Sequence, residues 1–138
     1  MKYMLDTNIC VYIIKRKPES VLNKLHACLD DGMAISTITL AELMYGVEAS
    51  LYPEKNAIAL QQFLSIVHVL PFDDGAAVAY GKICATLRRQ GTPIGPMDML
   101  IAAHAKALGL IVVTNNLREF ERVEGLGLEN WVTESHAG

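Results

Sequence analysis

The chain has 138 residues, of which 51% are apolar, and carries 12 basic and 15 acidic residues for a net charge of −3. This length suits one domain around one core, which we expect over residues 1–132, followed by a loose tail over residues 133–138. The longest apolar runs are too short to cross a bilayer, and the N-terminus lacks an apolar stretch of signal-peptide length. The sequence therefore predicts a cytoplasmic protein with no membrane partner.

The cysteines and the charge balance narrow the class of protein further. Cys10, Cys28 and Cys84 are scattered and odd in number, which favours small buried thiols in a reducing compartment over a disulfide framework. The acidic excess alone disfavours a nucleic-acid partner. However, three acids considered below account for the whole excess, and a bound cation would offset them. Net charge therefore neither supports nor excludes nucleic acid.

Hydrophobic spacing and breaks at Pro, Gly and Asp predict strands that alternate with helices. In the first half of the chain, we expect a strand over residues 2–5, a helix capped by Asn8 and ending near residues 15–17, a helix from Glu19 to residues 30–32 and a strand over 33–36. Next come a helix that starts at Thr37 or Thr39 and runs through Leu51, a helix from Pro53 through Ile66, and a strand over 67–70. The second half holds a long helix capped by residues 73–74 and broken at 91–93, a helix over 96–108, a strand over 110–114, a helical turn near 118–120 and a last strand near 128–131. Such alternation is typical of a parallel sheet covered on both faces. The predicted fold class is α/β, a three-layer α/β/α sandwich around a short, mainly parallel central sheet.

The same spacing predicts which helical side chains are buried. On the helix from Pro53, the side chains expected to point mostly inward are Ile58, Leu60, Phe63, Leu64 and Ile66. Met97 and Met99 lie on either side of Asp98 and are expected to pack in the core wall. His104 lies off the helical face of Asp98, so we expect it to be a packing or rim residue.

Three acids stand at strand ends and helix starts, where a parallel sheet gathers its site residues. Asp6 follows the first strand, Glu42 lies in the first turn of the third helix, and Asp98 follows a Gly-Pro pair at the head of a later helix. Crowded carboxylates repel one another, and a hard cation relieves that repulsion. Any one acid in a first helical turn is often only a favourable end charge. The hypothesis of a metal-dependent enzyme therefore rests on the set of three.

Several short segments in a fixed order add to this pattern. They are MLDTN at 4–8, ISTITLAEL at 35–43 with YG at 45–46, PIGPMD at 93–98, IAAHA at 101–105, and VTNN at 113–116 with Phe120 and Arg122. Each segment alone is a weak signal, but their order and spacing across residues 4–131 are specific. On these segments, the chain resembles the PIN-domain ribonucleases, and more closely the VapC-type toxins of bacterial toxin–antitoxin pairs.

The resemblance implies a small PIN-like α/β/α fold and a metal-dependent endoribonuclease. Asp6, Glu42 and Asp98 match the family's principal acids, and are expected to hold one or two Mg²⁺ or Mn²⁺ ions and to be catalytic. The fourth acidic position falls on Asn116, which offers a neutral oxygen and puts a second tightly held ion in doubt. Glu119 is near enough in sequence to substitute. Hydrolysis by a metal-activated water would leave a 5′-phosphate and a 3′-hydroxyl.

The resemblance also implies partners for this chain. They are a VapB-like antitoxin, a second copy of the chain in a homodimer, a toxin–antitoxin hetero-oligomer, and an RNA substrate. The RNA is expected to be tRNA, and initiator tRNA cut in its anticodon loop is the narrower hypothesis. Candidate substrate contacts are Thr7, Thr114, Asn116, Arg88 and Arg89, and candidate antitoxin-docking residues are Tyr12, Ile13, Tyr45 and Leu51.

Three other classes of protein stay in view. A non-catalytic RNA- or protein-binding module on the same fold is disfavoured, because buried like charges are costly to keep without a metal. A phosphoryl-acceptor receiver domain is disfavoured because no mid-chain strand ends in Asp and no lysine follows Lys106. A DNA nuclease stays open, since hydrolysis by a metal-activated water does not need the ribose hydroxyl.

Overall fold

The computed structural model describes residues 1–133. The strands are β1 (Tyr3–Leu5), β2 (Met33–Ser36), β3 (His68–Leu70), β4 (Ile111–Val113) and β5 (Leu128–Glu129). The helices are α1 (Thr7–Lys15), α2 (Glu19–Cys28), α3 (Thr37–Glu48), α4 (Pro53–Leu64), α5 (Asp74–Arg89), α6 (Pro96–Leu108) and α7 (Leu117–Phe120), with a 3₁₀ turn at Leu29–Asp31. The assignment of residues 1–132 to one domain stays a prediction. Of the predicted tail over residues 133–138, only residue 133 is among the described residues. No helix within residues 1–133 is long and apolar enough to cross a membrane.

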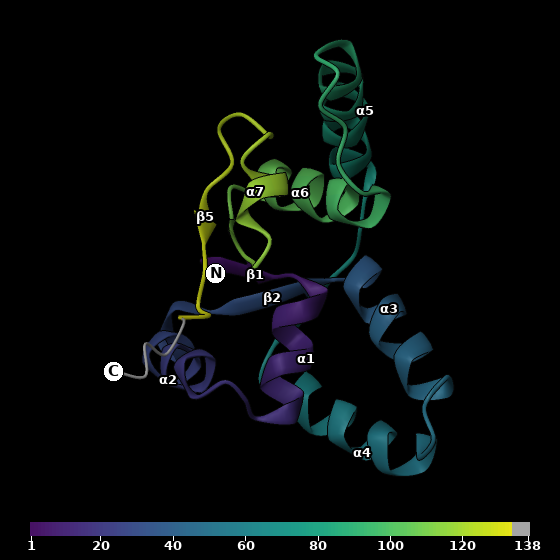
Figure 1. Ribbon diagram of the computed structural model, residues 1–138, viewed down its shortest axis with the longest axis vertical. Helices are drawn as coiled ribbons and strands as arrows, with labels where there is room; N and C mark the ends of the chain where they lie inside the picture. The colour runs from purple at the N-terminus through teal and green to yellow at the C-terminus, as the bar shows by residue number, and fades with distance from the viewer. Residues whose placement is uncertain (134–138) are drawn as a thin grey trace.

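The five strands form one parallel sheet in the order β3-β2-β1-β4-β5. The chain first moves outward from β1 through β2 to β3, and then returns to the other side of β1 to form β4 and β5 (Figure 1). The direction of the connections therefore reverses between β1 and β4. Ligands of open α/β sheets bind outside the carboxyl ends of the strands at such a reversal.

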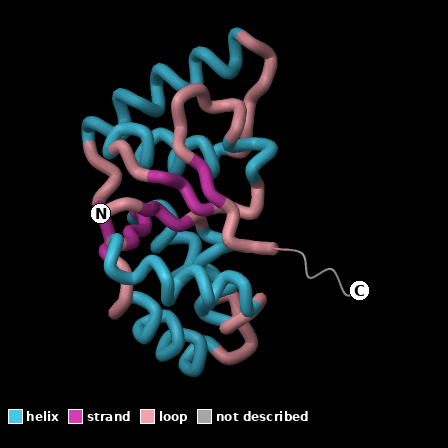
Figure 2. Tube along the Cα trace, turned by 90° about the vertical axis from the view of Figure 1, so that its left-hand side faces the viewer, coloured by secondary structure: helices cyan, strands magenta, loops and turns pink. Residues whose placement is uncertain are grey.

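Helices cover both faces of the sheet, which confirms the predicted three-layer sandwich. Side chains alternate between the faces along each strand. Tyr3 and Leu5 pack against α1–α4, whereas Met4 packs against α5–α7. Figure 2 shows the strands between these two groups of helices. Below, the α1–α4 group is called the first layer and the α5–α7 group the second layer.

The predicted cap of α1 is wrong, whereas α3 starts at Thr37, one of the two predicted positions. Asp6, not Asn8, caps α1, because its Oδ1 atom accepts a hydrogen bond from the backbone N–H of Ile9 at 2.9 Å. Ser36 caps α3 in the same way, since its Oγ accepts from Ile38 N at 3.1 Å. In both cases the last residue of a strand, or the first after it, has extended backbone and a short oxygen side chain, which suits an N-cap.

Some predicted core positions are wrong. Ile58 is 63% exposed, because α4 turns only one face, with Leu60 and Phe63, toward the core. Ile66 lies after the end of α4 and is 42% exposed. Met97 is 49% exposed, whereas Met99 is buried as predicted. A sequence period locates an apolar stripe, but it does not show how wide the covering layer is.

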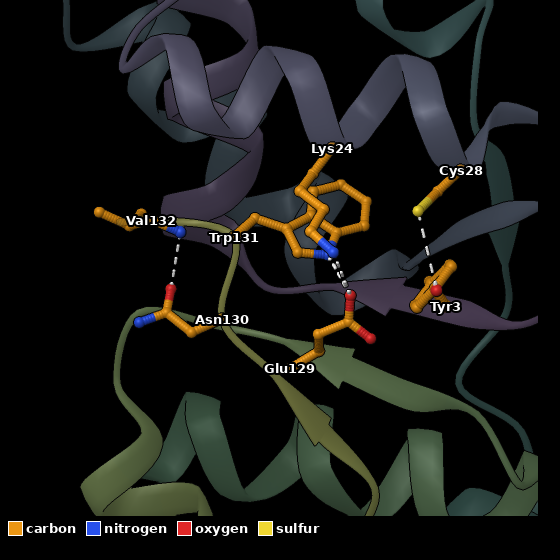
Figure 3. A network of polar contacts seen from close by, with 7 residues as sticks. All are labelled: Tyr3, Lys24, Cys28, Glu129, Asn130, Trp131 and Val132. Carbon is orange, nitrogen blue, oxygen red and sulfur yellow. Dashed lines mark hydrogen bonds and ion pairs between the residues drawn. The ribbon is translucent and has the colours of Figure 1, made fainter. Parts of the chain in front are cut away.

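The C-terminal edge of the described chain is pinned by a compact contact network (Figure 3). Trp131 is fully buried, stacks edge-on against Tyr3 with ring centroids 5.5 Å apart, and donates its Nε1–H to Glu129 Oε1 at 2.8 Å. Lys24 of α2 lies 3.8 Å from the same carboxylate oxygen, and Cys28 Sγ donates to Tyr3 Oη at 3.7 Å. β5 is therefore held to the first layer through side chains as well as to β4 through its backbone.

Candidate active site

The candidate site lies at the carboxyl ends of β1 and β4, where the sheet connections reverse direction. Asp6 is the first residue after β1, and Thr114 is the first after β4. The two strands pair in parallel, with Leu5 opposite Val113, so both residues emerge at the same edge. The register of one strand pair thus brings together residues that are more than one hundred positions apart.

Asp6 is 3% exposed at this edge. One carboxylate oxygen caps α1. Burial raises the pKa of Asp6, and the nearby negative charge of Glu42 adds to this, while hydrogen bonds from Thr114 and from the Ile9 backbone lower it. Thr114 also accepts a hydrogen bond from the backbone N–H of Asn116 at 2.8 Å. Thr114 therefore contacts Asp6 and also caps the turn that follows β4.

Asp98 and Glu119 meet across the side chain of Asn116. The Nδ2 group of Asn116 donates to Glu119 Oε2 at 2.9 Å and to Asp98 Oδ2 at 3.3 Å. Burial, the adjoining Glu119 carboxyl and the charge of Asp6 together raise the pKa of Asp98 to about 7, while the Asn116 hydrogen bond lowers it. Glu119, which the sequence offered only as a substitute for the fourth acid, therefore contacts Asp98 and Asn116 directly.

Glu42 approaches the group from the first layer. Thr7 Oγ1 donates to Glu42 Oε1 at 2.6 Å, so Thr7 orients this carboxylate. The prediction that Glu42 lies in a first helical turn is wrong: α3 begins at Thr37, which places Glu42 in its second turn. It therefore gains little from the partial positive charge of the helix N-terminus. The negative charge of Glu42 nonetheless raises the pKa of Asp6.

The donor set fits a hard divalent cation, which prefers carboxylate and amide oxygens. The Asn116 Nδ2 group lies between Asp98 and Glu119 and donates a hydrogen bond to each. These bonds partly offset the repulsion between the two carboxyl groups. Within residues 1–133, however, no three Asp, Glu, His or Cys side chains converge closely enough to hold an ion as they stand. Binding would therefore require Asn116 to turn its amide oxygen inward and the carboxylates to draw together.

The two predicted phosphate contacts of α5 lie outside this group. Arg88 and Arg89 are exposed on the last turn of the helix, and the Arg89 guanidinium donates to Thr86 Oγ1 at 3.5 Å. Among the described residues, neither arginine makes a hydrogen bond or ion pair with a site carboxylate. Their predicted role in binding substrate is untested.

A buried polar link between the two layers was missed from the sequence. His104 of α6 is 1% exposed, its Nδ1 lies 2.9 Å from Ser36 Oγ, and its ring meets Phe72 edge-on. Ser36 accepts from the Ile38 backbone, so its hydroxyl hydrogen is free to donate to His104 Nδ1. Burial lowers the pKa of His104, whereas the charge of Asp73 and a hydrogen bond with the Pro71 backbone raise it. A polar residue six positions past Asp98 was the available signal, but its partners come from distant segments.

Known proteins match this sequence and fold closely. The PIN domain family matches residues 3–126. The chain is 52% identical over 132 residues to a Shigella flexneri protein named tRNA(fMet)-specific endonuclease VapC, covering 95% of this chain and 98% of that protein. It is 50% identical over 132 residues to Ribonuclease VapC2 of Haemophilus influenzae, covering 96% and 99%. A solved structure of VapBC2 from Rickettsia felis, bound to a DNA fragment from its promoter, superposes with a TM-score of 0.91 at 44% identity, covering 96% of this chain and all of that chain.

A family match over residues 3–126, on a chain with this parallel sheet, together with relatives that cover 95% and 96% of the chain, defines the class of protein as a PIN-domain endoribonuclease. Within that class, the identity over nearly the whole length is decisive. The chain belongs to the PIN-domain family and, within it, to the VapC ribonucleases.

Proposed function

We propose that the chain is the toxin of a toxin–antitoxin pair, that Mg²⁺ or Mn²⁺ is its cofactor, and that its substrate is tRNA. The observation that carries this proposal is the contact of Asp98, Asn116 and Glu119 beside Asp6 at the sheet's switch point. The name of the Shigella flexneri relative supports initiator tRNA as the particular substrate. The anticodon loop as the cut site, and the cytoplasm as the place of action, are part of the same proposal.

Each site residue has a distinct part in the proposed reaction. Asp6 and Asp98 hold one or two ions, with Glu42, Glu119 and the amide oxygen of Asn116 as further ligands. A bound divalent cation supplies charge neutralisation for the phosphodiester and a lowered pKa for the attacking water. Thr114 holds Asp6 and Thr7 holds Glu42, so both carboxylates are oriented before substrate arrives. Thr7, Thr114, Asn116, Arg88 and Arg89 stay candidate contacts to the substrate.

The test is cleavage of total tRNA by the purified, antitoxin-free protein with Mg²⁺ or Mn²⁺, beside an EDTA control. Asp6→Asn is the matched variant, because asparagine also caps a helix and should preserve α1. We expect discrete fragments with 5′-phosphate and 3′-hydroxyl ends, absent with EDTA and with Asp6→Asn. Intact RNA from the folded protein under every metal condition would instead favour the non-catalytic binding module.

The solved VapBC structures support an antitoxin as partner. A groove of about 410 Å³ lies between α1, α2 and α4, is lined by apolar side chains such as Ile13, Leu25 and Phe63, and carries Arg16 and His26. An apolar antitoxin segment bearing an acid would suit this groove. Tyr45 and Leu51 continue the apolar surface, at 74% and 90% exposed. We propose that the antitoxin covers this surface of the first layer; a homodimer stays part of the proposal.

A further inference from the structure

A second concave surface lies in the second layer, away from the acidic site. It is a pocket of about 170 Å³ between α5, the end of α6 and the turn after α7, and it is called the basic pocket here. Its lining residues are Lys82, Ile83, Thr86, Leu87, Gln90, Lys106, Arg122, Val123 and Glu124. Ile83, Leu87 and Val123 are buried and form its floor, and the polar side chains form its rim.

Two of the three cations on the rim are fixed by backbone carbonyls. Lys106 Nζ donates to the carbonyl oxygen of Glu124 at 2.5 Å. Arg122 Nη1 donates to the carbonyl oxygen of Pro93 at 2.8 Å. A carbonyl does not neutralise a cation, so both side chains keep their full charge and their other N–H groups while losing mobility. The Lys82 side chain makes no hydrogen bond or ion pair within the described part of the chain, so its ammonium group is available to a ligand.

The charge around this pocket is opposite in sign to that of the whole chain. The stretch from Lys82 to Arg122 holds six of the twelve Lys and Arg residues but only three of the fifteen Asp and Glu residues. Two of those three acids, Asp98 and Glu119, belong to the candidate active site. Glu124 is the one acid among the lining residues of the pocket. A net positive rim on a net negative protein favours an anionic ligand.

The basic pocket is joined to the acidic site by a single loop. Pro93, which accepts the Arg122 hydrogen bond, is two residues before Gly95. A side chain added at Gly95 would lie 3.9 Å from Asp98 Oδ2 and 4.0 Å from Glu119 Oε2. Arg122 therefore lies at the border between the pocket and the site. Figure 1 shows α5, α6 and α7 on the same side of the sheet.

We propose that the basic pocket binds a backbone phosphate of the RNA whose scissile bond lies at the acidic site, an inference that rests on the proposed function. Several cations around a small open hollow suit a phosphate, which takes charge-assisted hydrogen bonds from lysine and arginine. The Thr86 hydroxyl and the Gln90 amide offer further donors on the α5 side of the rim. The acidic site repels a polyanion, and the basic pocket supplies attraction one loop away.

Lys82 is the residue to change, because Lys106 and Arg122 also hold backbone and their loss would disturb the fold. The experiment measures binding of fluorescently labelled tRNA in EDTA, where no metal-dependent cleavage occurs, at several salt concentrations. Lys82→Glu should weaken binding at least about fivefold, and Lys82→Ala should reduce the slope of log affinity against log salt by about one. The matched control is Lys55→Glu, an equal charge change on exposed α4 of the first layer.

Cleavage kinetics with Mg²⁺ or Mn²⁺ complete the test. Lys82→Glu should raise KM while kcat stays unchanged, because Lys82 does not touch the carboxylates. Equal tRNA affinity for Lys82→Glu and Lys55→Glu would overturn the proposal that the basic pocket binds phosphate, even if the wild type cleaves tRNA normally. A Lys82-dependent affinity in a protein that cleaves no RNA would uphold the pocket and overturn the nuclease assignment.

Discussion

The first and second helical layers cover the same sheet, yet they present different chemistry to solvent. The first layer exposes large apolar side chains on α3, on α4 and on the turn between them, namely Met44, Tyr45, Leu51, Tyr52 and Ile58. The second layer carries the basic pocket and half of the chain's cations. The acidic site lies between them, with Glu42 from the first layer and Asp98 from the second.

This difference indicates that the first layer binds a protein partner and the second layer binds RNA. Exposed apolar area is costly in a monomer and marks a surface that a protein partner covers. Cations without acidic partners suit a polyanion. A toxin held by an antitoxin and acting on RNA needs both surfaces, and separating them onto two layers lets each be changed without the other. The variants below test that separation, from the largest expected effect to the smallest.

The site itself should fail when either layer's acid is lost. We expect Asp98→Asn to lower kcat by more than about a hundredfold, since even changes behind a ligand cost about 10- to 100-fold. The same variant should raise the melting temperature in EDTA by about 3 °C, because it removes one charge from a crowded, partly buried group. Asp30→Asn, an exposed acid after α2, should change neither. Normal cleavage by Asp98→Asn would remove Asp98 from the site.

The link between the layers should matter for stability. We expect His104→Leu to lower the free energy of unfolding by about 2 kcal/mol, because the buried Ser36 hydroxyl loses its hydrogen-bond partner. Urea unfolding measures this, with the exposed His26→Leu as control. An unchanged midpoint for His104→Leu would show that the buried bond contributes nothing net.

The first layer alone should control antitoxin affinity. We expect Tyr45→Glu combined with Leu51→Glu to weaken antitoxin binding about tenfold or more, because exposed aromatic and aliphatic anchors dominate such interfaces. The cleavage of tRNA should be unchanged. Titration calorimetry with the cognate antitoxin measures the affinity, and Val78→Glu, 59% exposed on α5, is the control on the second layer. A larger loss for Val78→Glu would reverse the assignment of the two layers.

The smallest expected effect is at the end of α1, beside the apolar groove. Arg16 has φ 58° and ψ 39°, a left-handed conformation that glycine adopts without cost. We expect Arg16→Gly to raise the free energy of unfolding by up to about 1 kcal/mol. Arg16→Ala removes the same side chain but keeps the strain, so it should not be stabilising. Equal stability of the two variants in urea would show that the backbone there is not strained.

Local pattern alone was enough to predict the element order and the parallel sandwich, and to select the three acids as candidate site residues. The predicted strand ends lie within about two residues of the observed ones, because short apolar runs bounded by Gly, Pro and Asp leave few alternative boundaries. Asp6 and Asp98 could be chosen because one follows a strand and the other opens a helix. Thr114 and Asn116 could be added because they follow the clearest later strand.

Tertiary structure decided how these residues meet. The pairing of β1 with β4 brings Asp6 beside Thr114, and α7 carries Glu119 onto Asn116. The bond between His104 and Ser36, the exposure of Met97 and the basic pocket depend on how two layers lie on one sheet. A linear pattern records the period of each element but not the position of its neighbours, since burial and hydrogen-bond partners come from segments far apart in the chain. The residue types follow from the sequence, whereas their contacts follow from the fold.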